Sequence, residues 1–455
     1  MDQRANPSEG ESTMSETTSQ EWIDILTGKI RARTVRIGVI GLGYVGLSLA
    51  VEFAKAGLQV TGIEIDPDKV ARLQEGESYV QDVKPYEVKG LIADGKLIVV
   101  DDYRVLSELD AVSICVPTPL SKTKDPDISY IATATKEIVP YLHPGQLIVL
   151  ESTTYPGTTD EVILPALQKT GLEVGREFFV AFSPERIDPG NAQYRTHNTP
   201  KIIGGVTTSC AQVAKALYEL AIHRVVVVSS ARTAEMVKLL ENTFRAVNIG
   251  LVNEVALMCD RLKIDVWEVI EAAATKPFGF MPFYPGPGLG GHCIPVDPYY
   301  LAWKLKTLDY KARFIELAAE INTNMPWYVV SKVVDALNEQ RKSVYGANIL
   351  VLGVTYKRDT SDLRESPALD IIKILQNKGA TVSFADTFAA GLQNLDGAMH
   401  VPLEKEVIQA ADCVIIATDH SNVNYEWVVA HAPLVLDTRN VTKHLGKGPG
   451  RVIKL

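Results

Sequence analysis

Cysteine is scarce in this chain of 455 residues, and its scarcity argues against a disulfide framework. Disulfide-stabilised secreted domains need many closely spaced cysteines, so this usage favours a reducing compartment, and we expect a cytoplasmic protein. No CxxC or HExxH pattern occurs, and no metal site is predicted. The five cysteines are widely spaced and odd in number: Cys115, Cys210, Cys259, Cys293 and Cys413.

The chain also lacks a long apolar run and an excess of positive charge. No segment is apolar over the length that a bilayer span needs, and the N-terminus has no signal-peptide core, so we expect no membrane partner. The 46 Lys and Arg against 55 Asp and Glu give a formal net charge of −9. This balance argues against nucleic-acid binding through a basic surface. The remaining composition is that of a globular protein with room for two or three domains.

Strand and helix patterns alternate in two parts of the chain. Residues 1–19 are polar and expected to be a disordered tail, and residues 21–30 are expected to form a short helix. Apolar strand patterns follow at residues 35–40, 59–65, 111–116, 146–150 and 178–182, and again at 348–354, 381–384, 412–417 and 434–436. This alternation predicts two α/β domains, each with a doubly wound parallel sheet of the Rossmann-like kind.

The middle of the chain shows only helical patterns. Apolar spacing predicts one long helix from Thr233, its expected N-cap, to about Arg261. Further helices are predicted at residues 266–274, 299–321 and 327–338. We expect this block to join the two α/β domains and to carry the interface of a homodimer or a higher homo-oligomer. The predicted divisions are an N-terminal extension (1–33), a first α/β domain (34–232), the helical connector (233–340) and a second α/β domain (341–455).

A glycine-rich fingerprint lies between the first strand and the next helix. It comprises Gly41, Leu42, Gly43, Tyr44, Val45 and Gly46. Its glycines allow a tight turn and let a pyrophosphate approach the N-terminus of the helix. Glu64, at the tip of the next strand, is expected to accept hydrogen bonds from ribose hydroxyls and to repel a 2′-phosphate, with Asp66 as the alternative. The predicted cofactor is therefore NAD rather than NADP.

A second signal is the glycine- and proline-rich run at residues 284–298, which lies between helical patterns. A helix or strand interior does not tolerate this composition, whereas a stiff loop beside a ligand does. Cys293 lies in this loop, with His292 before it and Asp297 after it. We predict that Cys293 is a catalytic nucleophile and that the loop holds a sugar nucleotide. The alternative is that Cys293 packs as a small apolar residue.

Polar residues elsewhere fall where a ligand would lie. Lys238, Asn242 and Arg245 share one face of the long helix and suit an oxyanion clamp or, alternatively, a solvent-facing stripe. Loops after predicted strands line the ligand crevice of open α/β sheets. The loops concerned are residues 116–119, 152–156, 183–188, 356–366 and 436–439. In the third of these, Glu185 is either a base or a solvated acid.

Together these motifs resemble the UDP-glucose/GDP-mannose dehydrogenase family from about residue 34 to the C-terminus. The most specific matches are residues 151–157, 241–248, 276–280 and 290–297. Within the family, the chain is most similar to bacterial members that oxidise UDP-N-acetylglucosamine for surface polysaccharide such as O-antigen. Residues 186–191 differ from the apolar stretch of the UDP-glucose members, which suggests a different sugar pocket.

The resemblance implies a four-electron oxidation of the sugar C6 alcohol to a carboxylate with two NAD⁺. Alternatives are UDP-N-acetylmannosamine, UDP-N-acetylgalactosamine or UDP-glucose as the substrate. More distant alternatives are a single-step hydroxyacid dehydrogenase and a non-catalytic NAD-binding regulator. The first α/β domain would then bind NAD, and the second would bind the UDP-sugar.

The resemblance also implies residue roles. Cys293 would form a thiohemiacetal and then a thioester. Lys238 and Asn242 would stabilise oxyanions. Asp297 and Thr154 would hold water, and Glu185 would be the base for hydrolysis. Implied NAD contacts beyond the fingerprint are Glu64, Asp66 as its alternative, Lys69, Thr118, Thr153, Thr154 and Arg364. Implied sugar-nucleotide contacts are Glu185, Arg186, Arg245, Tyr284, Gly286, Gly288, Gly290, Lys357 and Arg439. Arg186, Arg245 and Asn191 are the candidates for recognition of an N-acetyl group.

Overall fold

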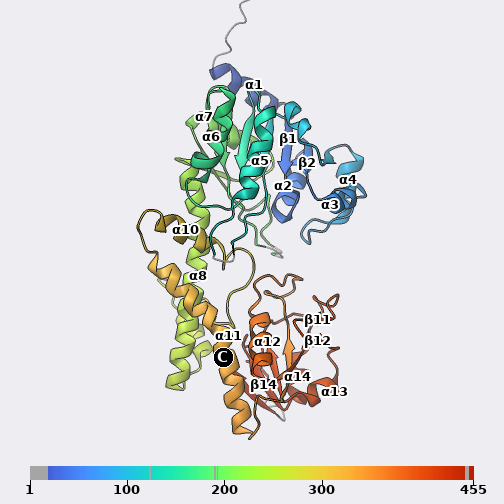
Figure 1. Cartoon of the computed structure of the whole chain (residues 1–455), viewed down its shortest axis with the longest axis vertical. Coiled ribbons are helices and arrows are strands. Elements are labelled where there is room, and N and C mark those ends of the chain that lie inside the picture. The colour runs from blue at the N-terminus through green and yellow to red at the C-terminus, as the bar shows by residue number, and fades with distance from the viewer. Residues whose placement is uncertain (1–18, 122–123, 189–190, 192, 446–449) are drawn as a thin grey trace, which may run out of the picture. The chain divides into compact units, whose positions relative to one another are not determined.

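The computed structural model describes residues 19–121, 124–188, 191, 193–445 and 450–455 (Figure 1). Most of the predicted tail lies outside these residues. The predicted short helix is α1 (Ser19–Arg31). The chain divides into two compact units. The first comprises residues up to Thr118 together with Ile128–Glu235, and the second comprises Pro119–Asp127 and Met236–Leu455.

The first unit contains an 8-stranded sheet in the order β3-β2-β1-β4-β5-β6-β7-β8. Neighbouring strands are parallel except β6 and β7. The strands are β1 (Arg36–Ile40), β2 (Gln59–Ile63), β3 (Leu97–Val100), β4 (Ala111–Ile114), β5 (Leu147–Leu150), β6 (Phe179–Phe182), β7 (Lys201–Gly205) and β8 (Val225–Val228). The order reverses between β1 and β4, so a ligand crevice is expected at the carboxyl ends of these two strands.

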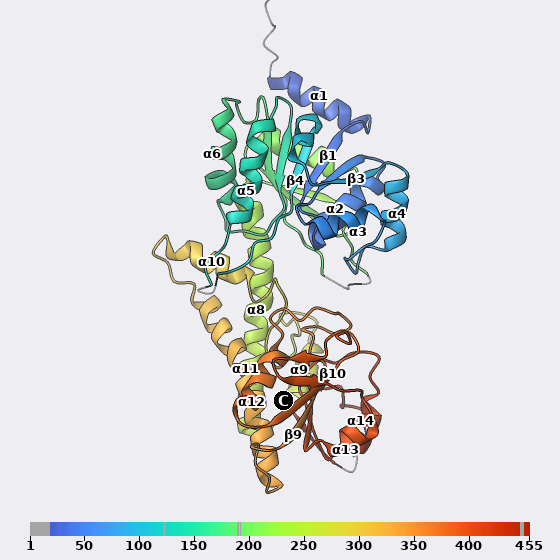
Figure 2. The same ribbon diagram turned by 45° about the vertical axis from the view of Figure 1, so that its right-hand side comes forward.

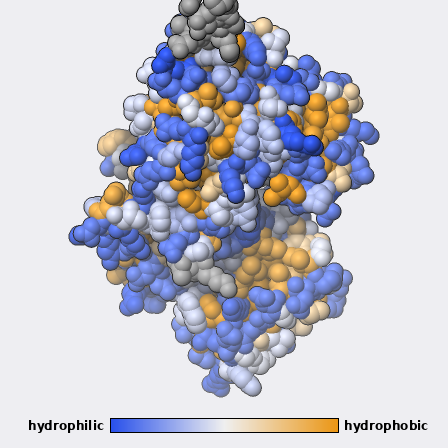
Figure 3. Space-filling model, turned by 45° about the horizontal axis from the view of Figure 1, so that its top comes forward, coloured by the Kyte–Doolittle hydropathy of each residue, from blue (hydrophilic) through white to orange (hydrophobic). Residues whose placement is uncertain are grey.

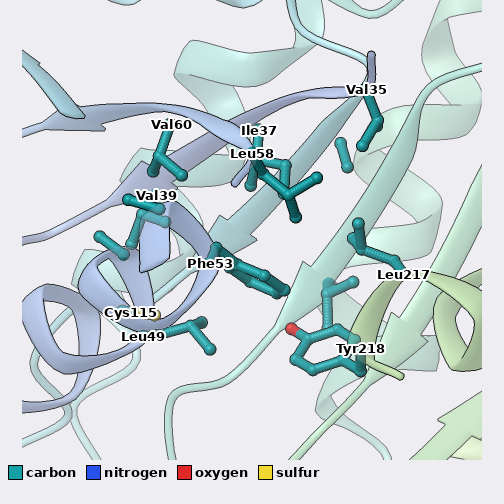
Figure 4. Close-up of a cluster of buried hydrophobic side chains, with 14 of the residues drawn as sticks. Val35, Ile37, Val39, Leu49, Phe53, Leu58, Val60, Cys115, Leu217 and Tyr218 are labelled. Carbon is teal, nitrogen blue, oxygen red and sulfur yellow. The ribbon is translucent and has the colours of Figure 1, made fainter. Parts of the chain in front are cut away.

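Hydrophobic side chains of the first unit meet between the sheet and the helices α1, α2 and α7. Figure 4 shows Phe53 of α2 beside Tyr218 of α7, and their ring centroids are 5.4 Å apart. The residues of β4 and β5 are buried throughout, as expected when both faces of a parallel sheet are covered. The helices are α2 (Tyr44–Lys55), α3 (Pro67–Gln74), α4 (Pro85–Ala93), α5 (Ser129–Ile138), α6 (Leu164–Leu167) and α7 (Thr208–Tyr218), with the short turns η1 (Tyr103–Glu108), η2 (Val139–Tyr141), η3 (Thr159–Ile163) and η4 (Gln168–Thr170).

The second unit contains a 7-stranded sheet in the order β11-β12-β10-β9-β13-β14-β15, parallel except for β11 and β12. Its strands are β9 (Asn348–Leu352), β10 (Thr381–Ala385), β11 (Asn394–Leu395), β12 (Ala398–His400), β13 (Cys413–Ile416), β14 (Leu434–Asp437) and β15 (Arg451–Lys454). Its sheet-associated helices are α12 (Pro367–Asn377), α13 (Lys405–Ala410) and α14 (Tyr425–His431). The two sheets confirm the predicted architecture of two Rossmann-like α/β folds.

The long helix α8 (Ala231–Leu262) confirms the predicted central helix, and the boundary between the two units falls within it. Figures 1 and 2 show α11 (Arg313–Glu339) running alongside α8. The two helices approach closely at Gly250, where an added Cβ would lie 3.1 Å from Ala318 Cα. The connecting helices are α9 (Val266–Ala274) and α10 (Asp297–Lys306).

Two predictions about this helical block are wrong. Thr233 is not the N-cap of α8, because the helix begins at Ala231 and Ser230 Oγ accepts a 3.1 Å hydrogen bond from the Thr233 amide. The expected helices at 299–321 and 327–338 are divided differently. The first ends at Lys306, and α11 continues through Pro326. Burial of α11 in the core outweighs the one helical hydrogen bond that this proline removes.

On the face shown in Figure 3, hydrophilic residues cover much of the surface, and hydrophobic residues gather in scattered groups. None of the helices formed by the described residues is both long enough and apolar enough to cross a membrane.

Candidate functional site

The glycine-rich fingerprint forms the turn from β1 into α2. Glycine is found at each of its three glycine positions for a different structural reason. Gly41 has φ +84°, a left-handed conformation, and its missing side chain leaves room for the Cys115 carbonyl. A Cβ on Gly46 would lie 1.8 Å from the Gly41 oxygen, so the turn and the helix can pack only with glycine there. A Cβ on Gly43 would meet no atom within 4 Å. This open side at the N-terminus of α2 fits a pyrophosphate approaching the backbone amides.

Glu64 follows β2 and is tied to this turn. Its buried carboxylate accepts a 2.9 Å hydrogen bond from the Leu42 amide. Asp66 has a different task, because its side chain caps α3 by accepting from the Asp68 and Lys69 amides. The Lys69 ammonium lies 4.0 Å from Glu64 and 3.8 Å from Asp66. Glu64 also accepts hydrogen bonds from the Ile65 and Asp66 amides, so both carboxylates are bonded to backbone, and of the two it is Glu64 that contacts the glycine turn.

The remaining residues of the predicted cofactor site in the first unit lie near the carboxyl ends of β1, β4 and β5. In the turn, Leu42 is buried, and Tyr44 and Val45 are half-buried. Tyr44 donates a 2.9 Å hydrogen bond to Asp82. The threonine after β4 and the two after β5 are half-buried or buried, and Thr154 Oγ1 lies 2.6 Å from Thr158 Oγ1. These three are Thr118, Thr153 and Thr154.

Glu185, the predicted base, follows β6 and belongs to a buried ionic cluster. Its Oε1 accepts 2.7 Å hydrogen bonds from the Arg186 and Ile187 amides, and its Oε2 lies 3.4 Å from Lys201 Nζ. The same ammonium lies 2.5 Å from Glu151, which also accepts a hydrogen bond from the Tyr218 hydroxyl. Burial raises the pKa of Glu151 to about 7 although Lys201 opposes the shift.

The candidate sugar-recognition residues of the first unit lie beyond Glu185. Arg186 Nη1 donates a 2.5 Å hydrogen bond to the Pro200 carbonyl, which fixes the orientation of the guanidinium. The side chain of Asn191 accepts hydrogen bonds from the Gln193 and Tyr194 amides and so shapes its own loop.

The thiol and its polar neighbours meet in the second unit. Asn242 Nδ2 on α8 donates a 2.5 Å hydrogen bond to Oδ2 of Asp297, the first residue of α10. Lys238, one helical turn before Asn242, is also buried. The Cys293 carbonyl accepts a 2.8 Å hydrogen bond from the Asp297 amide, so the thiol residue is tied to the start of α10. Cys293 is half-buried, whereas the other four cysteines are buried.

Charges around the thiol oppose one another. Burial raises the pKa of the Cys293 thiol to about 11, and the negative charge of Asp297 adds to the rise. The positive charges of Lys238, Arg364 and Arg245 act in the opposite direction. Burial also raises the pKa of Asp297 to about 6, while Lys238 and the hydrogen bond from Asn242 oppose that rise. A bound substrate that removed the Asp297 charge would thus favour the thiolate.

His292 precedes Cys293 in the chain and contacts the loop that follows β9. Arg364 Nη2 lies 3.0 Å from His292 Nδ1, and Arg364 also forms an ion pair with Asp362. Burial and the Arg364 charge lower the pKa of His292 to about 4, so the ring is neutral near pH 7. The Arg364 carbonyl accepts a 2.9 Å hydrogen bond from Gly291. Arg364, predicted to contact NAD, thus lies against the loop that carries the thiol.

The glycine- and proline-rich loop is fitted to the second α/β fold. A Cβ on Gly286 would lie 2.9 Å from Arg439 Nη1, and one on Gly290 would lie 2.6 Å from Tyr356 Cβ. Tyr284 stacks on Trp267 with ring centroids 6.0 Å apart. Arg439 follows β14, and its Nε donates to the Ala417 carbonyl. The carbonyl of half-buried Lys357, after β9, accepts from the Thr360 hydroxyl.

The structure therefore brings the predicted residues together in two groups, one in each unit. It also reveals residues that the sequence interpretation missed. Glu151 begins a motif that the resemblance used without giving this residue a role, and Lys201 stands on a strand that was not predicted. Two buried asparagines near the loop, Asn253 and Asn322, gave no signal, because the first lies within an ordinary helical pattern and the second directly follows one.

Three domain descriptions of one family match the chain in order. They are the UDP-glucose/GDP-mannose dehydrogenase family NAD binding domain at residues 35–222, the central domain at 232–324 and the UDP binding domain at 350–444. The glycine turn fits the first assignment, because its open middle glycine and its neighbouring carboxylate suit NAD.

Curated relatives and solved structures agree with this assignment. The chain is 36% identical over 438 residues to UDP-N-acetyl-D-mannosamine dehydrogenase of Methanococcus maripaludis, which covers 92% of this chain and 96% of that protein. It is 36% identical over 398 residues to UDP-N-acetyl-D-glucosamine 6-dehydrogenase of Pseudomonas aeruginosa, covering 86% and 91%. A structure of the UDP-D-ManNAc dehydrogenase from Pyrococcus horikoshii has a TM-score of 0.84 at 35% identity and covers 92% of this chain and 99% of that one. The chain belongs to the UDP-glucose/GDP-mannose dehydrogenase family of NAD-dependent oxidoreductases.

Proposed function

We propose that the protein oxidises the C6 alcohol of a UDP-N-acetylhexosamine to the carboxylate, with UDP-N-acetylglucosamine as the first candidate and UDP-N-acetylmannosamine as the second. The observation that carries this proposal is the half-buried Cys293 beside the Lys238, Asn242 and Asp297 cluster, in a loop fitted to the second α/β fold. Relatives that share 36% of their residues with this chain are named for both sugars.

Bound NAD⁺ would accept a hydride in each of the two oxidations. The Lys238 ammonium and the Asn242 amide would stabilise negative charge on the C6 oxygen while its proton passes to solvent water. Cys293 would then add through Sγ to the C6 aldehyde, forming a C–S bond, while the carbonyl oxygen takes up the proton that the thiol releases. The resulting thiohemiacetal retains the hydrogen on C6 that leaves in the second oxidation. Water would cleave the thioester and release the acid and the free thiol.

Asp297 would take part in the proton transfers of this scheme. Its raised pKa of about 6 lies close to neutral pH, so its carboxyl can take up or release a proton during turnover. Glu185 would serve as the base for hydrolysis, because Lys201 and two backbone amides hold its carboxylate in one orientation.

Recognition of the N-acetyl group is the finer part of the proposal. Arg186, Arg245 and Asn191 are the candidates, and Arg186 is the first to test because its guanidinium is already oriented by the Pro200 carbonyl. The Arg186→Leu variant should lose activity on N-acetylated sugars more than on UDP-glucose. Equal loss on both would remove Arg186 from this role.

The test of the function is an NADH-production assay against UDP-N-acetylglucosamine, UDP-N-acetylmannosamine, UDP-N-acetylgalactosamine and UDP-glucose. Two NADH per sugar with a carboxylate product support the proposal. One NADH per sugar would indicate a single-step dehydrogenase. The Cys293→Ser variant should not form a thioester, and full turnover in that variant would exclude the covalent route.

We also propose that the protein acts as a homodimer in the cytoplasm. An apolar stripe runs along α8 at helical spacing, formed by Met236, Leu240, Phe244, Leu251, Met258 and Leu262, each 37% to 67% exposed. Exposed apolar residues in such a row are typical of an interface between helices. The five cysteines are free thiols, as expected in a reducing compartment.

A further inference from the structure

Two buried asparagines link the long helices α8 and α11 to the glycine- and proline-rich loop. Asn253 of α8 is 0% exposed, and Asn322 of α11 is 5% exposed. Asn253 Nδ2 donates a 2.8 Å hydrogen bond to Asn322 Oδ1, and Asn253 Oδ1 accepts a 2.9 Å hydrogen bond from the Gly286 amide. Asn322 Nδ2 donates to the Ala246 carbonyl at 3.2 Å. Each amide thus has a partner on both sides.

The orientation of both side chains is fixed by backbone at the two ends of this chain of hydrogen bonds. A backbone amide can only donate, so the atom of Asn253 that faces Gly286 must be its oxygen. The Asn253 nitrogen must then face Asn322, whose own nitrogen faces the Ala246 carbonyl. A flip of either side chain would place two donors or two acceptors together inside the protein.

The loop also approaches the backbone of α11 closely. Because residue 326 is proline, the Asn322 carbonyl lacks the amide that a helix ordinarily supplies four residues further on. A Cβ on Gly288 would lie 3.2 Å from this carbonyl oxygen, and Gly288 has φ +138°. Gly286, held by Asn253, is the residue that packs against the Arg439 guanidinium. The same contacts therefore fix the position of the loop relative to Arg439, which is a candidate contact of the UDP-sugar.

We propose that Asn253 and Asn322 are positioning residues that hold the loop at Tyr284–Gly290 in the conformation that binds the UDP-sugar. Neither side chain is assigned a contact with the substrate. The inference rests on the proposed function for the identity of the ligand, but the hydrogen bonds that it invokes do not depend on that ligand. The Asn253 side chain holds Gly286 directly, and the Asn322 side chain acts through Asn253, so the loss of either should affect nucleotide-sugar binding and leave NAD binding unchanged.

The variants Asn253→Ala and Asn322→Ala test this, with Asn248→Ala as the control. Asn248 lies on the same helix, and its side chain donates only within that helix, to the Phe244 carbonyl at 2.7 Å. Loss of a buried hydrogen-bond network should raise the KM for the UDP-sugar, and the Kd for UDP measured by calorimetry, by about tenfold or more. The KM for NAD should stay within about twofold of the wild type. A twofold change corresponds to less than about half a kcal/mol of binding free energy.

Hydrogen exchange supplies a readout that does not depend on turnover. The peptide that contains Gly286 should exchange faster in Asn253→Ala than in the wild type or in Asn248→Ala. Unchanged exchange in that peptide, or a lowered melting temperature with unchanged UDP affinity, would overturn the inference. If the wild type oxidised no UDP-sugar, the proposed function would fail, whereas the exchange comparison would still decide the positioning role.

Discussion

Asn242 donates a hydrogen bond of 2.5 Å to Asp297 and so joins the middle of α8 to the first residue of α10. This contact holds a buried carboxyl group close to the only half-buried cysteine among the five. Because the carboxylate and the nearby cations have opposite effects on the thiol, the reactivity of Cys293 depends on which of these charges is present.

The first prediction concerns that thiol. Asp297→Asn removes the negative charge that raises the pKa of Cys293, so the thiol pKa should fall from about 11. Lys238→Met removes a positive charge and should raise it. A change of one pKa unit alters the thiolate population about tenfold, so alkylation by iodoacetamide at pH 8 should speed up in the first variant and slow down in the second. Mass spectrometry locates the label, and Cys293→Ala provides the blank. The same rate in both variants would contradict the assignment of charges.

The second prediction concerns cofactor choice. Glu64→Gln removes the charge that would repel a 2′-phosphate, and it leaves one oxygen to accept either from the Leu42 amide or from the Ile65 and Asp66 amides. We expect the preference for NAD over NADP, measured as a ratio of kcat/KM, to shrink at least about tenfold. Asp66→Asn is the matched control, because asparagine also caps a helix, and its preference should match the wild type. A large change in the control instead of the test variant would transfer the role to Asp66.

The third prediction concerns the buried cluster of Lys201, Glu151 and Glu185. Lys201→Met leaves two buried carboxylates without their cation and should lower the free energy of unfolding by about 3–5 kcal/mol at pH 8. The pKa of Glu151, about 7 with the cation present, should rise further without it. Above about pH 7 the native variant then binds a proton that both the wild type and the unfolded chain lack, so its loss of stability should shrink as the pH falls from 9 to 7 and change little below 7, where Glu151 is protonated in both native proteins.

Urea unfolding at pH 6, 7, 8 and 9 measures this dependence. Lys215→Met is the control, since Lys215 is exposed on α7 and pairs with Glu219 at 3.6 Å, and its effect should stay within about 0.5 kcal/mol. A loss of stability in Lys201→Met that is constant with pH would argue for a packing defect in place of an electrostatic one.

The fourth prediction concerns the N-terminal helix α1, which lies before the segment matched to the family. Leu26 is 2% exposed in the core of the first unit, whereas its neighbour Ile25 is 44% exposed. Leu26→Ala should cost about 2–5 kcal/mol of unfolding free energy, and Ile25→Ala about 0.5 kcal/mol or less. Because Lys29 of this helix pairs with Asp110, which precedes β4, α1 lies near the amino ends of the strands, away from the cofactor turn. The KM for NAD should therefore be unchanged in both variants.

The fifth prediction concerns the apolar stripe on α8. Leu251 is 54% exposed, and a charge in a packed helix interface is strongly unfavourable. Leu251→Glu should shift the protein from dimer to monomer in sedimentation velocity. Met399→Glu places the same charge at an equally exposed residue on β12 and should leave the dimer intact. A wild-type protein that sediments as a monomer would remove this role from the stripe.

Many strands and helices of this architecture could be predicted from the sequence. Buried parallel strands are continuous apolar runs, so the strands at 35–40 and 348–354 were predicted nearly to the residue. The strands β3, β7, β8, β11, β12 and β15 were not predicted. Of these, β3 and β8 are only four residues long and unevenly buried, whereas β7 is fully buried and contains a lysine and two glycines, which weaken an apolar strand pattern. The division of the helices around Pro326 was wrong, since local preference carries no information on how tightly a helix is packed.

Patterns among neighbouring residues are enough to show which chemical groups this protein can offer. A glycine fingerprint after a strand and a cysteine in a glycine- and proline-rich loop are local patterns, and so is the helical spacing that places Lys238 and Asn242 on one face. Such patterns can be recognised from the sequence because dihedral limits and helical periodicity act over a few neighbouring residues.

Which of these groups meet depends on how distant parts of the chain pack together. It paired Asn242 with Asp297 across 55 positions and gave Lys201 two carboxylates to neutralise. It also placed Asn253 and Asn322 under the loop, although nothing near either residue in the chain indicated a role. Such partners are chosen by the packing of distant elements, because a buried polar group must find its hydrogen bonds wherever the fold brings a donor or an acceptor within reach.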